Sequence, residues 1–130
     1  MTAPKPVARP QSPFMIPKYY RLQMTSASSF ATRATGHAII VTAALVVWWL
    51  VAAATSDQAF ALADLVATSW FGDLVFTLSL WAFWYHFLAG LRHLYYDALH
   101  GMEIRTAELL GWVCFIGATV LTPITILLVQ

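Results

Sequence analysis

The residues best suited to chemistry lie within an apolar stretch, WAFWYHFLAGLRHLYYD, at residues 81–97. Four polar or ionisable side chains interrupt it: His86, Arg92, His93 and Asp97. An ionisable residue inside an apolar span is costly, so it usually marks a site or faces the interior of a helix bundle. Neutral imidazole suits haem iron, and Gly90, one turn after His86, would admit a flat macrocycle on the same helix face. From the residues alone, His86 is either an iron ligand or a histidine that hydrogen-bonds a neighbouring helix.

The other three polar residues of this stretch lie together at its end. Asp97 follows His93 by four residues, so the two side chains share a helix face and can touch. With Arg92 they could form a polar pocket where a charged head group or a redox ligand meets the membrane surface. They could equally form an ordinary interfacial boundary, with the neighbouring tyrosines in an aromatic belt.

A third candidate group lies earlier in the chain, in SASSFATRATGH at residues 26–37. Ser29 and Arg33 are four residues apart and therefore share one helix face. A hydroxyl donor beside a permanently charged guanidinium could bind a carbonyl or a carboxylate near the interface. The alternative is a helix start capped by serines, followed by an arginine on the cytoplasmic side.

The elements that carry these residues belong to a membrane protein. The chain is 60% hydrophobic and only 10% charged, whereas a soluble domain has about 25% charged residues. Apolar runs at about 34–55, 70–91 and 107–129 approach or exceed the ~20 residues that cross a hydrocarbon core. Lipid offers no partner to backbone amides, so each run must be helical. We predict an all-α membrane protein with three transmembrane helices, forming one domain over residues 29–130.

The segment before this domain, residues 1–28, is rich in proline and is predicted to be irregular. Basic residues gather at the start of the chain, and the loop around 55–70 has no lysine or arginine. By the positive-inside rule the N-terminus and residues 92–106 are cytoplasmic in a bacterial inner membrane, or face the matrix in a mitochondrion. The net charge of +1 gives no sign of nucleic-acid binding.

Three motifs together resemble those of a known family. RPQSP lies near the start, SSFATRATG opens the first span, and HFLAGLRHLYYD ends the second. They match the patterns RP-x-SP, S-x-x-x-R-x-(S/T)-G and H-x-x-x-G-(I/L)-R-H-(L/M)-x-x-D. The chain thus resembles, over roughly residues 9–130, the cytochrome b membrane-anchor subunits of succinate dehydrogenase, respiratory complex II.

The resemblance implies roles for the matched residues. His86 corresponds to the axial ligand of haem b, and Ser29 and Arg33 correspond to residues of the ubiquinone site, with Arg33 also near a haem propionate. Arg92, His93 and Asp97 correspond to an interfacial motif near the quinone pocket and the iron–sulfur subunit. Thr32 stands where many members have a histidine close to a propionate, and His37 is a candidate to replace it. Phe14 stands where many members have another histidine.

The resemblance also implies partners. A second three-helix anchor would supply the other axial histidine, and an iron–sulfur subunit carrying a flavoprotein would dock on the cytoplasmic face. The chain itself would do no covalent catalysis. Two other readings remain open on the residues: a haem-free membrane tether for a soluble enzyme, and a small transporter subunit.

Overall fold

The computed structural model describes residues 20–129, so the RPQSP motif, Phe14 and most of the proline-rich segment lie outside the described residues. The described part forms four helices: α1 (Met24–Thr55), α2 (Asp57–Ala67), α3 (Trp70–Asp97) and α4 (Ile104–Val129). Three of them, α1, α3 and α4, are long and apolar enough to cross a membrane. The predicted all-α class with three spans is confirmed.

The first helix begins at Met24, well before the apolar run at residue 34 and inside the segment assigned to the tail. Its first turns are polar, but their hydroxyls bond the carbonyls of the same helix. Ser28 Oγ donates to the Thr25 carbonyl at 3.0 Å, and Thr32 Oγ1 donates to the Ser28 carbonyl at 2.8 Å. Because these groups are satisfied locally, the helix continues through them.

The stretch around 55–70, treated above as a loop, is mostly the short helix α2. Ser56 caps it by accepting a hydrogen bond from the Ala59 amide at 3.2 Å, and Asp57 places a carboxylate in its first turn. Both features stabilise a helix N-terminus. Ser69 caps α3 in the same way, through the Gly72 amide at 3.1 Å. With 11 residues, α2 is too short to span a bilayer.

Large apolar side chains mostly face outward, and small residues fill the contacts between helices. Ala52, Ala63, Ala82, Ala89 and Ala118 are all buried. Small residues at helix interfaces are typical of membrane bundles, where association depends on close backbone packing rather than on water exclusion. The outward apolar surface is the one that lipid or partner helices would cover.

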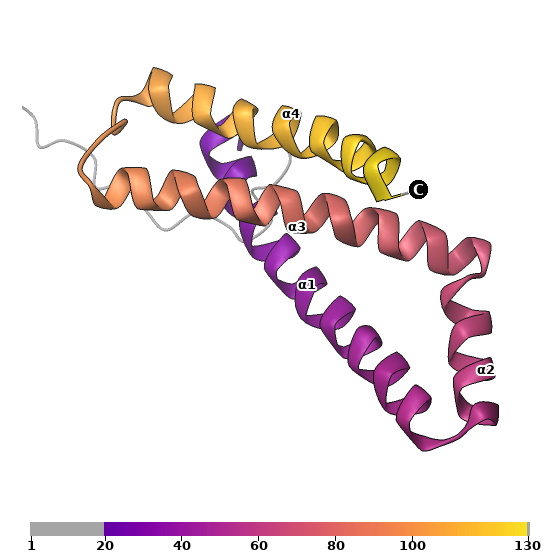
Figure 1. Ribbon diagram of the computed structural model, residues 1–130. Coiled ribbons are helices and arrows are strands. Elements are labelled where there is room, and N and C mark those ends of the chain that lie inside the picture. The colour runs from indigo at the N-terminus through magenta and orange to yellow at the C-terminus, as the bar shows by residue number, and fades with distance from the viewer. Residues whose placement is uncertain (1–19, 130) are drawn as a thin grey trace, which may run out of the picture.

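The spans converge at one end of the molecule and separate at the other (Figure 1). α3 and α4 run side by side, whereas α1 crosses α3 near its own N-terminal part and then diverges. α2 joins the far ends of α1 and α3. The start of α1 also meets α4, since a Cβ on Gly111 would lie 3.0 Å from Met24 Cγ.

Tyr85 is the centre of the packed end. Its side chain has no exposed surface, stacks on Trp81 with ring centroids 5.4 Å apart, and lies 4.7 Å from the Phe115 ring. Its hydroxyl donates to the Ser28 carbonyl at 3.1 Å. The ring therefore fixes α1 against α3 and α4 at the level of the polar residues, and buried Cys114 packs beside it.

Candidate functional site

His86 lies half-buried on α3 and contacts α1. Its Nδ1 is 3.0 Å from the Thr32 carbonyl oxygen and 3.3 Å from Thr35 Oγ1. Gly36 lies against the ring, because a Cβ there would be only 3.0 Å from His86 Cε1. Thr35 and Gly36 are the last two residues of the SSFATRATG motif on α1. Because Gly36 has no side chain, the imidazole has room to approach the helix backbone.

These contacts assign the tautomer of the neutral imidazole. A carbonyl oxygen can only accept, so Nδ1 carries the hydrogen and donates a hydrogen bond to the Thr32 carbonyl, which leaves the lone pair of the neutral ring on Nε2. Within residues 20–129, His86 Nε2 has no hydrogen-bond partner. Arg92 Nε is the sole buried side-chain nitrogen or oxygen without a partner in this part of the chain, so Nε2 is not a buried atom. Nε2 is therefore open at the bundle surface. A backbone partner on one ring nitrogen is the usual arrangement for a histidine whose other nitrogen binds a metal.

An apolar groove of about 490 Å³ lies between α1 and α3, beginning one turn from His86: its α1 residues follow Gly36, and its α3 residues precede His86. Ile39 and Phe83 are among its lining residues, and Thr42 Oγ1 donates to Ser79 Oγ inside it at 2.7 Å. Gly90, on the other side of His86, faces open space: nothing lies within 4 Å of where a Cβ would be. A flat apolar group could thus extend along this face.

Arg33 and His37 lie on α1 beside the contact with His86, and both are exposed. Arg33 Nε donates to the Ser29 carbonyl at 3.3 Å, and His37 Nδ1 lies 2.8 Å from the Arg33 carbonyl. Ser29 and Arg33 do share one helix face, as their spacing predicts. Neither Arg33 nor His37 touches His86 through a hydrogen bond in the described part of the chain.

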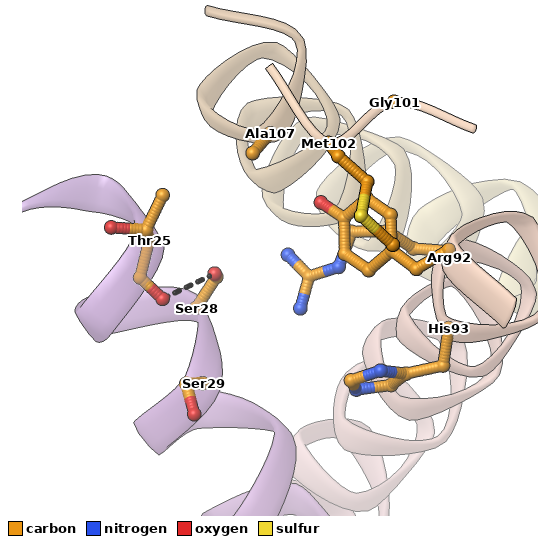
Figure 2. A pocket seen from close by; sticks show the side chains of 9 residues that line it. Thr25, Ser28, Ser29, Arg92, His93, Gly101, Met102 and Ala107 are labelled. Atoms are coloured by element: carbon orange, nitrogen blue, oxygen red, sulfur yellow. Dashed lines mark hydrogen bonds between the residues drawn. The ribbon is translucent and has the colours of Figure 1, made fainter. Parts of the chain in front are cut away.

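A second cavity of about 350 Å³ lies at the packed end, among α1, α3 and the segment leading into α4 (Figure 2). Ser29 and His93 line it from opposite sides. The complete lining is Thr25, Ser28, Ser29, Arg92, His93, Tyr96, Gly101, Met102 and Ala107. The cavity combines hydroxyls, an imidazole and a cation with apolar walls, which suits a polar ring or head group carrying oxygen acceptors.

Arg92 is the least expected feature of this cavity. Only 7% of its surface is exposed, and its Nε is buried without a hydrogen-bond partner. The guanidinium carbon lies 5.9 Å from the centroid of the Tyr96 ring. The sequence left Arg92 either in a polar pocket at the membrane surface or at an ordinary interfacial boundary, but nothing in its spacing indicates that it turns into the bundle.

The structure therefore regroups the candidate residues. It brings Ser29, Arg92 and His93 to one cavity, which neither Arg33 nor Asp97 lines. Asp97 is exposed at the end of α3. Gly36 and Thr35 belong to a matched motif, yet only the contact with His86 reveals what they do there.

Within residues 20–129, no three histidine, cysteine, aspartate or glutamate side chains gather to hold a metal ion. A metal bound through His86 would have to bring further ligands in a macrocycle or take them from another chain. His86 Nε2, the apolar groove and the open face at Gly90 fit a haem, which His86 would hold through its iron.

Comparisons with known proteins place the chain in a family. Residues 5–125 match the family described as Succinate dehydrogenase/Fumarate reductase transmembrane subunit. The chain is 48% identical over 119 residues to the succinate dehydrogenase cytochrome b556 subunit of Paracoccus denitrificans, covering 92% of this chain and 90% of that protein. It is 31% identical over 121 residues to the protein of the same name in Rickettsia conorii, covering 88% and 87%.

Proposed function

Because the chain belongs to the family of succinate dehydrogenase/fumarate reductase transmembrane subunits, and is a cytochrome b membrane anchor of complex II, we propose that it binds haem b and ubiquinone. In this proposal a second three-helix anchor completes the haem site. An iron–sulfur subunit bearing a flavoprotein docks where α1, α3 and α4 converge. Electrons from succinate then pass through flavin and iron–sulfur clusters to the quinone.

The observation that carries the haem proposal is the hydrogen bond from His86 Nδ1 to the Thr32 carbonyl at 3.0 Å. It orients the ring and leaves Nε2 free for iron, with the second axial histidine supplied by the partner anchor. Bound haem supplies one-electron redox chemistry close to the quinone. This chain contributes the ligand, the glycine that admits it and the apolar groove beside it.

Arg33 and His37 are proposed to bind the haem propionates. Both are exposed beside the stretch of α1 that His86 contacts. A guanidinium is permanently charged and pairs well with a carboxylate. His37 follows one turn later and would take the place of the histidine that many relatives carry at the position of Thr32.

The quinone head group is proposed to occupy the cavity lined by Ser29. Ser29 forms no side-chain hydrogen bond within residues 20–129, so its hydroxyl is free to donate to a ring carbonyl. Arg33 Nε donates a hydrogen bond to the backbone carbonyl of Ser29 at 3.3 Å, and the guanidinium adds positive charge from outside the cavity. His93 lies in the cavity wall, and Asp97 lies beyond it, at the end that the iron–sulfur subunit would cover.

The proposed location is a bacterial inner membrane, with the N-terminus and the α3–α4 connection on the cytoplasmic side. Single cysteines at Gln58 and Met102, in a Cys114→Ala background, should react with an impermeant reagent from opposite sides. Both parent residues are exposed. Gly101 is unsuitable, because its φ is +69° and a Cβ there would lie 2.6 Å from Tyr95 Cε1. Labelling of both positions from one side would contradict the three-span topology.

The proposed function is tested by purifying the tagged chain from its native membrane. We expect a second anchor, an iron–sulfur protein and a flavoprotein to copurify, with a b-type absorption band in the reduced-minus-oxidised spectrum. The same partners without the band would identify a haem-free tether. A preparation containing none of these partners would contradict complex II and leave a transporter subunit as the alternative.

A further inference from the structure

Arg92 is a buried cation to which the proposed function assigns no reaction step. Its side chain is 7% exposed, and Nε has no hydrogen-bond partner within residues 20–129. Burying a charged group is costly unless hydrogen bonds or an opposite charge offset the lost hydration. None of the residues that line the surrounding cavity is acidic. The ring of Tyr96, 5.9 Å away, offers only a weak cation–π contact.

The direction of the side chain supplies the second observation. Figure 2 shows the guanidinium extending from α3 into the space between α1, which carries Ser28 and Ser29, and the first turns of α4, which carry Ala107. Ser29 faces the same space from the opposite side. A molecule between them would meet a hydroxyl donor on one side and a guanidinium on the other.

We propose that Arg92 is a catalytic residue of the quinone site, which contacts a ring oxygen of the bound quinone and stabilises the negative charge that develops there during reduction. The inference rests on the proposed function. It places a second cation, Arg92, inside the cavity. Arg33, the cation already proposed for the quinone site, is exposed and does not line the cavity.

The chemistry assigns a limited role to each group. Reduction to quinol takes two electrons, delivered one at a time by the iron–sulfur partner, and two protons, and it converts both ring C=O groups to O–H. Arginine stays protonated at all relevant pH values, so Arg92 donates hydrogen bonds without giving up a proton. Both protons come from water at the open side of the cavity, where His93 is exposed. A fixed cation aimed at a developing oxyanion lowers the barrier more than it strengthens binding of the neutral quinone.

The test measures quinone reduction by the assembled complex with a short-chain ubiquinone. Arg92→Gln should lower kcat by about tenfold or more, while KM stays within about twofold, because the interaction strengthens only as charge develops. Succinate oxidation with a soluble dye should be unchanged. Arg92→Lys should recover part of the lost kcat because it keeps the charge. Arg105→Gln, which removes an exposed arginine of α4 outside the cavity, is the matched control.

The outcomes separate this inference from the proposed function. If Ser29→Ala impairs quinone reduction and Arg92→Gln does not, the role of Arg92 is overturned and the quinone site stays in place. If neither variant is impaired, the cavity is not the quinone site. A loss in Arg92→Gln that appears only in KM, or that lysine does not relieve, would also overturn the role, since it would indicate packing rather than charge.

A second measurement avoids any substitution of Arg92, in case Arg92→Gln fails to assemble. A hydroxynaphthoquinone that is ionised at neutral pH should compete with ubiquinone several-fold better than its uncharged methyl ether. That preference should persist in Arg33→Leu, because Arg92 still faces the cavity. Its complete loss in Arg33→Leu would assign the charge to Arg33 and overturn the inference.

Discussion

Replacing His86 with alanine should abolish the low-spin b-type absorption of the assembled complex. The imidazole hydrogen-bonds α1 from within α3, and the bond from its Nδ1 to the Thr32 carbonyl leaves Nε2 as the free ligand atom. Without it, haem iron would keep a single axial histidine from the partner anchor and become high-spin, or the haem would be lost. The measurement is the reduced-minus-oxidised spectrum, with haem content per complex determined chemically.

The matched control is His100→Ala, which removes an exposed histidine after α3. It should retain the full spectrum. Substitutions of Thr32 and His37 should shift the haem potential only modestly, because neither side chain is proposed to bind iron. An unaltered bis-histidine spectrum in His86→Ala would show that another residue binds the iron.

Ser29→Ala should lower succinate-to-quinone turnover by about tenfold or more, since losing one hydrogen-bond donor to the bound ring costs ~1–3 kcal/mol and more where charge develops. Arg33→Leu should have a comparable effect, because Arg33 bonds the Ser29 carbonyl at 3.3 Å and supplies positive charge nearby. Arg33→Lys should rescue only in part, since an ammonium lacks the planar fork of a guanidinium. Dye reduction by succinate should survive in all three variants, because flavin and clusters belong to other chains.

The deciding quantity is the ratio of quinone-reductase to dye-reductase activity in assembled complex. Ser26→Ala is the matched control for the serine: Ser26 lies on the same helix, donates to the Gln23 carbonyl at 2.9 Å and does not line the cavity. It should leave the ratio unchanged. If Ser29→Ala and Arg33→Leu also leave the ratio unchanged, the head group does not bind at this part of α1.

Sequence alone was sufficient for the fold class and for the number of spans. Apolar runs of spanning length have one stable backbone conformation in lipid, so three helices follow from composition and length. The motifs around Ser29, Arg33 and His86 were sufficient for the family. The helical start of α1 and the helix α2 were missed, because serine-rich segments and short segments form helices only when caps and local hydroxyl bonds satisfy their ends.

Spacing along one helix correctly predicted that Ser29 and Arg33 share a face, because that relation depends only on the helical repeat. It could not predict that Ser29 meets Arg92 across a cavity, that Arg92 is buried, or that Gly36 lies against His86. Those relations depend on where α1 crosses α3, and the crossing is set by the fully buried Tyr85 and by alanines packed between the spans. The sequence by itself determined the spans and the residues with chemical potential. Only the tertiary structure decided which of them face one another, because contacts between helices arise from packing of side chains that are distant in the chain.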